Sequence, residues 1–252
     1  MSAAYEPMVG RYLRLTLGGL ACRVYVEEAG QGIPLICLHT AGADGRQYRH
    51  LLTDHEVTDR FRVIVFDMPW HGKSSPPEGW QDTDYQLTTA AYLEMVLALA
   101  DALALEQPVV MGCSIGGRAV LHLARLHGAR LGAVIGLQSS AMVEPYYDTS
   151  WLHRGDVHGG EVSAAQVSGL IAPDAPSAER WETLWHYMQS GPGVFRGDLH
   201  FYEYEGDIRA QLAEIDTRVC PVFMLTGAYD YSCTPAESEA TAAAIAGAEL
   251  TI

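Results

Sequence analysis

A serine flanked by glycines is the best candidate nucleophile in this sequence. Residues 109–117 read VVMGCSIGG, so Ser114 lies in a G-x-S-x-G pattern between an apolar run and a helical pattern. A serine on a sharp turn from a strand into a helix is raised clear of the sheet edge, and glycines such as Gly112 and Gly116 relieve the crowding of that turn. The pattern therefore predicts Ser114 as a nucleophile, with the Ile115 N–H pointing at the same spot from the start of the helix.

Such a serine needs a base to take its proton and a carboxylate to orient that base. Asp230 follows the apolar run 219–225 and precedes a well-marked helix. It could be a loop or helix-capping aspartate, but its expected place on the same sheet edge as Ser114 favours the role of the acid. Glu144, just past the apolar run 133–137, is the second candidate.

Two loops after earlier apolar runs complete the candidate site. In the sequence LHTAG, which ends the run 33–38, we assign a second oxyanion donor to the backbone N–H of Ala41, opposite that of Ile115. His39 leaves the strand directly, and we interpret it as a loop-stabilising residue rather than the base. The loop DMPWHGKS, which follows the run 61–66, has turn-forming composition, and we interpret it as a structural loop braced by Asp67 and Ser74.

The elements around these loops alternate between strand and helix patterns. Residues 11–17 and 21–27 alternate apolar and polar side chains around two glycines, as in a half-exposed antiparallel hairpin. Short, nearly continuous apolar runs, typical of strands buried on both faces, follow at 33–38, 61–66, 109–112, 133–137 and 219–225. Helical patterns lie between them. The sequence predicts an α/β fold with a mostly parallel sheet, helices on both faces and right-handed crossovers.

The last predicted helix has the clearest boundaries. Thr234 is the expected N-cap, Pro235 takes the first helical position, Glu237 completes a capping box, and Gly247 follows the helix as a stop.

One segment, about 144–215, lacks apolar strand runs and is rich in Trp, Tyr and Phe. It is typical of an insertion between two strands. Its aromatic residues could form a small core of their own, or several could line an apolar pocket over the sheet. For that pocket we select Trp151, Trp185 and Tyr187, together with Thr40 of the LHTAG loop.

Composition excludes several classes of function. The chain has 252 residues, with 16 Lys and Arg against 31 Asp and Glu, for a net charge of −15, which disfavours nucleic acid and anionic membranes. Its five cysteines are odd in number, scattered and without zinc-site spacing, as expected of reduced thiols. We find neither an export signal nor a run of ~20 apolar residues, and expect a soluble, cytoplasmic protein.

The order of these features resembles the α/β-hydrolase superfamily, and most of all its lidded esterase and carbon–carbon hydrolase branch. The likeness covers about residues 11–252: an oxyanion loop, a D-x-x-x-H-G-x-S loop, a G-x-S-x-G turn, a lid-like insertion and a late acid. It implies a core over residues 1–143 and 216–252, incomplete at its C-terminal strand and helix, with a lid over 144–215.

The resemblance implies the roles already assigned above. Ser114 is the nucleophile, Asp230 is the acid, and the N–H groups of Ala41 and Ile115 are the oxyanion donors. The chain departs from the family pattern at two positions. Thr40 stands where a His-Gly pair has its glycine, and Trp70 stands where a small turn residue is common. Neither change removes a backbone donor.

The base histidine of such a site is missing from its expected place. In the family it follows the acid, beyond one more strand, but all ten histidines of this chain precede Asp230. We therefore expect residues 248–252 to begin that strand, and a continuation of the chain to supply the histidine. Two alternatives stay open: His71, His158 or His200 serves as the base, or the protein binds a ligand without hydrolysing it.

The predicted reaction is hydrolysis of a small or medium carboxylic ester through an acyl-enzyme on Ser114, with no metal or organic cofactor. Cleavage of a carbon–carbon bond or cofactor-free perhydrolysis is the enzymatic alternative, and a small-ligand receptor is the non-enzymatic one. The oligomeric state is left open, with a homodimer among the choices.

Overall fold

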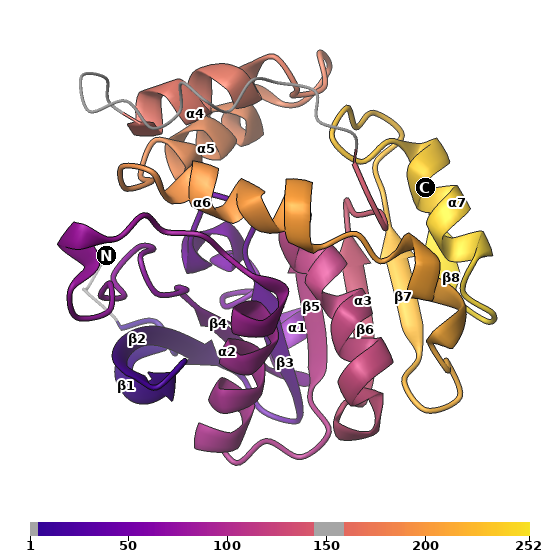
Figure 1. Cartoon of the computed structure of the whole chain (residues 1–252), viewed down its shortest axis with the longest axis horizontal. Helices are drawn as coiled ribbons and strands as arrows, with labels where there is room; N and C mark the ends of the chain where they lie inside the picture. Colours follow the sequence, from indigo (N-terminus) through magenta and orange to yellow (C-terminus); the bar gives the residue numbers. More distant parts are fainter. Residues whose placement is uncertain (1–4, 144–158) are drawn as a thin grey trace.

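The computed structural model describes residues 5–143 and 159–252, which form a mixed sheet with helices on both faces (Figure 1). The strand order is β1-β2-β4-β3-β5-β6-β7-β8. The strands are β1 (Val9–Leu17), β2 (Leu20–Ala29), β3 (Ile33–Leu38), β4 (Phe61–Phe66), β5 (Val109–Cys113), β6 (Ala133–Leu137), β7 (Val222–Leu225) and β8 (Glu249–Thr251). The α-helices are α1 (His55–Thr58), α2 (Thr89–Ala102), α3 (Ile115–His127), α4 (Gly159–Ser168), α5 (Ser177–Tyr187), α6 (Val194–His200) and α7 (Pro235–Ala243).

The sheet is antiparallel at its N-terminal edge and parallel elsewhere. Strands β1 and β2 form the predicted hairpin, and β2 pairs antiparallel with β4. From β4 through β3, β5, β6 and β7 to β8, every pairing is parallel. The carboxyl ends of these parallel strands therefore meet at one edge of the sheet, where the predicted site residues follow them.

The central strands are buried on both faces, as their continuous apolar sequences predict. Ile36 and Ile64 belong to the larger core cluster, which includes the apolar faces of α2 and α3. Their neighbours Cys37 and Val65 point to the opposite side and pack in a second cluster with Tyr48. The α/β fold predicted from the alternation of elements is confirmed.

One strand is shorter than predicted. The apolar run 219–225 becomes a strand only from Val222, because the N–H groups of Val219 and Cys220 both donate to the Asp216 carbonyl in a tight turn. Pro221, which has no N–H to donate, then separates this turn from the strand. Apolar composition alone could not distinguish the turn from the strand.

The C-terminal helix has the predicted caps. Thr234 accepts from the Glu237 N–H and the Glu237 carboxylate accepts from the Thr234 N–H, while Pro235 begins α7. Gly247, with φ of 84°, follows the helix and leads into β8, which pairs with β7 as the predicted last strand.

Helices α4, α5 and α6 lie between β6 and β7 in the chain and above the sheet edge in Figure 1. They are followed by a π-helical segment, η4 (Phe201–Glu205), and a 3₁₀-helical segment, η5 (Arg209–Glu214). Residues 144–158 lie outside the described residues, and with them Glu144 and Trp151. The division of the chain at 144 and 215 stays a prediction.

None of the helices in residues 5–143 and 159–252 has the length and apolar character needed to cross a lipid bilayer. The five cysteines are free thiols, four of them buried.

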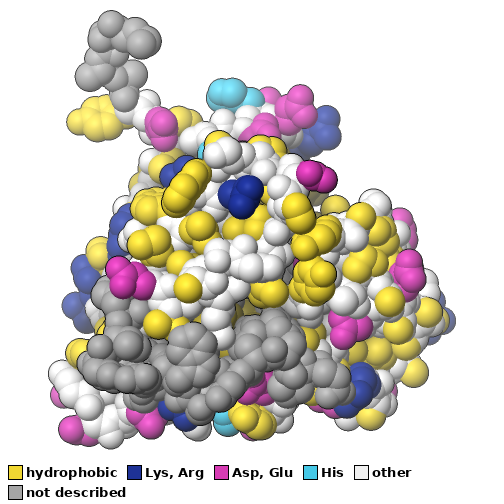
Figure 2. All heavy atoms as spheres, turned by 90° about the horizontal axis from the view of Figure 1, so that it is seen from above, with side chains coloured by type: hydrophobic (Ala, Val, Ile, Leu, Met, Phe, Trp, Pro, Cys, Tyr) yellow, Lys and Arg dark blue, Asp and Glu magenta, His cyan; other side chains and the backbone are white. Residues whose placement is uncertain are grey.

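Figure 2 looks down on the molecule from above the view of Figure 1, and there hydrophobic side chains occupy much of the surface.

Candidate active site

The backbone at Ser114 is held in a conformation that serine seldom adopts. Ser114 follows β5 and precedes α3, with φ of 54° and ψ of −109°. Its N–H donates to the Leu137 carbonyl of β6 at 2.9 Å, and its carbonyl accepts from the Arg118 N–H. Backbone strain of this kind costs about 1–3 kcal/mol and persists only where the surrounding structure enforces it. The predicted strand-to-helix turn is therefore present, and Ser114 is at its tip.

Close backbone contacts explain the glycines of this turn. A Cβ added at Gly112 would lie 2.3 Å from the carbonyl carbon of Gly116, and a Cβ at Gly116 would lie 2.8 Å from the Leu38 carbonyl oxygen. The start of helix α3 is thus in close backbone contact with β5 and β3. No other residue type fits at either position without moving the backbone.

Ser114 and Asp230 line the same cavity. It has a volume of about 340 Å³, within the range of small-molecule sites. The core contributes Thr40, Ala41, Cys113, Ser114, Gln138, Tyr229, Asp230 and Ser232. The segment between β6 and β7 contributes Val167, Leu170, Ile171, Ala172, Thr183, Tyr187, Phe195, Leu199 and Tyr202.

The backbone N–H groups of Ala41 and Ile115 are available for a ligand. Neither donates a hydrogen bond within the described part of the chain, whereas those on either side of Ala41 are occupied. The Thr40 N–H donates to the Gln47 side chain at 2.8 Å, and the Gly42 N–H donates to Asp198 at 2.7 Å. Ala41 lines the cavity, and the Ile115 N–H is at the start of α3, next to Ser114.

Asp230 is fixed by the loop that carries it. Its Oδ1 accepts from the N–H groups of Ser232 and Cys233 at 2.7 and 2.8 Å. Burial raises the pKa of Asp230 above its ordinary value, and the nearby Glu237 carboxylate raises it further, while the two amides act in the opposite direction. Its second oxygen, Oδ2, accepts no hydrogen bond from the described residues, so it could orient an imidazole.

No histidine of the described residues lines the cavity. His71 is buried and bonded to Asp198 at 2.9 Å, and the His200 ring packs on Tyr204 with a centroid distance of 5.4 Å. His158 lies outside the described residues. Neither His71 nor His200 is therefore placed to take the proton of Ser114.

The rings of His39 and His71 pack against each other in a tilted arrangement next to the candidate oxyanion loop, residues 39–42, with a centroid distance of 4.8 Å. His39 Nε2 accepts from the Met68 N–H at 3.3 Å and Nδ1 donates to the Thr40 carbonyl, so its ring is neutral and braces the loop as predicted. Burial, and then the adjacent His71, lower the pKa of His39 to about 4.

His71 differs from His39 because both of its ring nitrogens face acceptors. Nδ1 is 2.9 Å from the Pro69 carbonyl oxygen and Nε2 is 2.9 Å from Asp198 Oδ2. Burial alone would lower the pKa of His71, but the Asp198 carboxylate outweighs it and the pKa is raised. A charged imidazolium that donates at both nitrogens satisfies this geometry.

Asp198 connects α6 to the candidate oxyanion loop. Its carboxylate is fully buried and accepts from the Gly42 N–H, from His71 and from the Tyr85 hydroxyl at 2.8 Å. Sequence reasoning missed this residue. One sequence feature could have identified it: Asp198 is an acidic residue between the apolar Phe195 and Leu199, in a stretch otherwise suited to a helix packed on the core.

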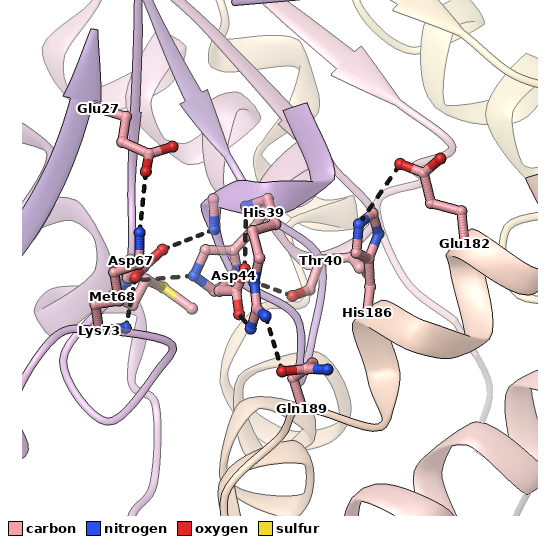
Figure 3. A network of polar contacts seen from close by, with 12 residues as sticks. Glu27, His39, Thr40, Asp44, Asp67, Met68, Lys73, Glu182, His186 and Gln189 are labelled. Atoms are coloured by element: carbon pink, nitrogen blue, oxygen red, sulfur yellow. Dashed lines mark hydrogen bonds and ion pairs between the residues drawn. The ribbon is translucent and has the colours of Figure 1, made fainter. Parts of the chain in front are cut away.

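The loop after β4 has the structural role predicted for it. Asp67 accepts from the Lys73 N–H at 2.7 Å (Figure 3). It also accepts from the Gly45 N–H at 2.8 Å, and the Ser74 hydroxyl donates to the Asp67 carbonyl. Trp70, in place of a small turn residue, has φ of 77°, in the left-handed region that favours glycine. Its indole stacks on Tyr85 at 5.3 Å.

Of the selected pocket residues, Thr40 and Tyr187 line the cavity, and their hydroxyls are 3.4 Å apart. Trp151 lies outside the described residues. Trp185 is not among the described residues that line the cavity: it is 39% exposed, and its ring packs under the guanidinium groups of Arg46 and Arg49. Trp185 and Tyr187 are two positions apart on α5, so their side chains leave the helix in directions about 200° apart around its axis. They therefore cannot lie on the same face of α5.

Near Trp185, α5 and the segment after it contact the core through polar side chains. Glu182 accepts from Arg49 at 2.9 Å and from His50 at 3.1 Å, and the Gln189 side chain accepts from Arg46 at 2.8 Å. Figure 3 shows Glu182 and His186 on the same helix and Gln189 beyond its end, close to the loop that carries Asp44.

Comparisons with known proteins agree with this geometry. A family model described as the alpha/beta hydrolase fold matches residues 33–155. The structure superposes on an enol-lactonase from Burkholderia xenovorans LB400 with a TM-score of 0.80 and 20% sequence identity, over 95% of this chain and 90% of the other. This chain has the α/β-hydrolase fold.

Curated relatives match only part of this chain. A pimeloyl-[acyl-carrier protein] methyl ester esterase from Aeromonas hydrophila is 34% identical over 117 residues, 46% of this chain and 42% of the esterase. A 2-hydroxymuconate semialdehyde hydrolase from a Pseudomonas species is 28% identical over 141 residues, 56% of this chain and 47% of that enzyme. The chain spans less than half the length of these relatives.

We expect Gly112→Ala to lower the free energy of unfolding by about 2–3 kcal/mol, because its Cβ would overlap the Gly116 backbone. Urea denaturation measures this. Gly169→Ala is the matched control, since its nearest contact would be an ordinary 3.6 Å. Equal stability of the two variants would contradict the packing described for the turn.

We expect His71→Gln to destabilise the protein by about 3 kcal/mol at pH 6, because it leaves Asp198 buried without its cation. The pKa of His71 is higher in the folded protein than in the unfolded chain, where it is about 6.5. The stabilisation that His71 gives the folded state is therefore complete below pH 6.5 and is lost as pH rises through the folded-state pKa. The difference in the free energy of unfolding between His71→Gln and wild type should therefore shrink toward pH 9. A difference that grows with pH, or that the exposed His55→Gln reproduces, would refute this account.

Proposed function

We propose that this protein is a serine hydrolase that cleaves carboxylic esters through an acyl-enzyme on Ser114. The observation that carries the proposal is the arrangement around one cavity: a strained serine, the Asp230 carboxylate, and two unoccupied backbone donors, the N–H groups of Ala41 and Ile115. Under this proposal, residues 144–215 act as a lid over the cavity.

In the proposed reaction, Ser114 Oγ attacks the ester carbonyl carbon while a base takes its proton. The N–H groups of Ala41 and Ile115 hold the negative oxygen of the tetrahedral intermediate, and the alcohol leaves with the proton. Water then attacks the acyl carbon and releases the acid and Ser114. We assign the base to a histidine outside the described residues, bonded to Asp230 Oδ2.

The thiol next to the nucleophile does not compete with it. Burial raises the pKa of Cys113 to about 12, so the group stays protonated at neutral pH. A thiol is a far weaker nucleophile than a thiolate. Ser114 is therefore the group of the described cavity best suited to form an acyl-enzyme.

Ser114→Ala should lower the hydrolysis of p-nitrophenyl butyrate by about three orders of magnitude or more, because no other described group can replace the nucleophile. Release of p-nitrophenol measures the rate, and intact-protein mass spectrometry detects the acyl adduct. The exposed Ser177→Ala is the matched control. Undiminished turnover in Ser114→Ala would end the proposal.

The walls of the cavity favour an uncharged acyl group. No Lys or Arg is among its described lining residues, and its one carboxylate is Asp230. Part of the wall is formed by apolar residues of α6 and of the segment between α4 and α5, such as Leu170, Ile171 and Leu199. A substrate carboxylate placed there would lose its hydration without gaining a cation.

Two esters that differ only in the group at the end of the acyl chain test this preference. We expect kcat/KM for p-nitrophenyl valerate to exceed that for mono-p-nitrophenyl glutarate, in which a carboxylate replaces the methyl group, by about tenfold or more. Rates measured with Ser114→Ala give the uncatalysed background. Equal rates for the two esters would contradict the preference, although the proposed hydrolysis would stand.

A small-ligand receptor is the second candidate, and it is favoured by one observation: no described histidine lines the cavity. A receptor would bind a small apolar ligand tightly without turning over any ester. Carbon–carbon bond cleavage, the activity class suggested by the likeness to 2-hydroxymuconate semialdehyde hydrolase, would need the same serine and the same base. Turnover of p-nitrophenyl esters excludes the receptor.

A further inference from the structure

One buried carboxylate connects the segment between β6 and β7 to the candidate oxyanion loop. Asp198, on α6, is fully buried, and its Oδ2 accepts from the Gly42 N–H at 2.7 Å. The same oxygen is 2.9 Å from Nε2 of His71, and Oδ1 accepts from the Tyr85 hydroxyl at 2.8 Å. Hydrogen bonds to a buried carboxylate are strong and directional, so these three contacts hold the carboxylate in one orientation.

The peptide groups before Ala41 are held by other partners. The Thr40 N–H donates to the Gln47 side chain at 2.8 Å. The Thr40 carbonyl accepts from His39 Nδ1 at 2.9 Å and from the Ala43 N–H at 3.2 Å. In a trans peptide group the carbonyl and the N–H point in opposite directions. These bonds therefore direct the Ala41 N–H away from the His39 ring.

The peptide group after Ala41 is held from α6. Gly42 has φ of 65°, and glycine adopts positive and negative φ about equally readily, so the local sequence does not fix this peptide group. A Cβ added at Gly42 would lie 2.8 Å from Cδ2 of Phe195, so the loop packs directly on α6 here. Among the described residues, the hydrogen bond from the Gly42 N–H to Asp198 is the one that holds this peptide group.

We propose that Asp198 is a positioning residue for the oxyanion donor: by binding the Gly42 N–H, it keeps the Ala41 N–H directed at the place where the negative oxygen forms. This inference rests on the proposed function. Asp198 is not among the described residues that line the cavity, so it acts through the loop and not on the substrate. A donor stabilises the transition state only when it lies about 2.7–3.1 Å from that oxygen, and a rotated peptide group loses this contact.

The test is Asp198→Ala, which removes the acceptor of the Gly42 N–H. We expect kcat for p-nitrophenyl butyrate to fall about tenfold to a hundredfold, with KM changed less than about twofold. The second readout is inhibition by pentyl trifluoromethyl ketone. Ser114 Oγ adds to its carbonyl carbon, the base takes the Oγ proton, and the ketone oxygen becomes negative, as in the transition state. The inhibition constant should rise by the same factor, whereas an inactive fraction of the protein would lower kcat and leave this constant unchanged.

Two further variants separate this hydrogen bond from the other contacts of Asp198. Asp198→Asn keeps an oxygen that accepts from the Gly42 N–H while its amide group donates to the Tyr85 oxygen, so kcat should stay within about threefold of wild type. Tyr85→Phe is the matched control: it removes a different hydrogen bond from the same carboxylate and should change kcat less than about twofold. An Asn variant as impaired as Asp198→Ala, or an equal loss in Tyr85→Phe, overturns this role of Asp198.

The outcomes separate this inference from the proposed function. If wild type neither hydrolyses the ester nor is inhibited by the ketone, the proposed function fails. If wild type does both and Asp198→Ala matches it, only the role of Asp198 fails. If Asp198→Ala does not fold, a crystal structure of the wild-type ketone adduct decides. An adduct oxygen within about 3 Å of the Ala41 nitrogen, with the Gly42 N–H still on Asp198, supports the proposal. A Gly42 N–H that leaves Asp198 to bind this oxygen overturns it.

Discussion

The close approach of three backbone segments at the carboxyl end of β5 determines the rest of this site. Helix α3 starts so near to β5 and β3 that only glycine fits at positions 112 and 116, and the chain between them must pass through the left-handed conformation found at Ser114. This geometry puts a hydroxyl group and the amide end of a helix at the same point. Everything else in the candidate site is arranged around that point, because the parallel strands β3, β5 and β7 all end at this edge.

The second organising feature is the set of buried charges behind the site. Asp198 comes from α6, yet its carboxylate is bonded to the Gly42 N–H of the candidate oxyanion loop and to His71 of the loop after β4. Arg118 comes from α3, yet its guanidinium fixes the Tyr202 carbonyl and ring. Each charge ties the segment between β6 and β7 to a loop or helix of the sheet layer. The cavity wall and the candidate oxyanion donors therefore depend on one another.

Several parts of the site could be predicted because they follow from local rules. The G-x-S-x-G pattern between an apolar run and a helical pattern identified the serine turn, and the capping box before α7 located the loop of Asp230. Trp185 shows the limit of such rules. An aromatic residue in an aromatic-rich segment suggested a pocket, but the helical phase of α5 and two arginines from the core put it elsewhere.

By itself, the sequence determined the order of strands and helices, the boundaries of β3 and β4, the serine turn and the C-terminal cap. These depend on hydrophobic periodicity and on the conformational preferences of Gly, Pro, Ser and Thr, which act over a few residues. Only the tertiary structure decided that Asp198 binds His71 and that Arg118 binds Tyr202. These two pairs are 127 and 84 residues apart in the sequence, and a contact between distant residues depends on how the elements pack rather than on any local pattern.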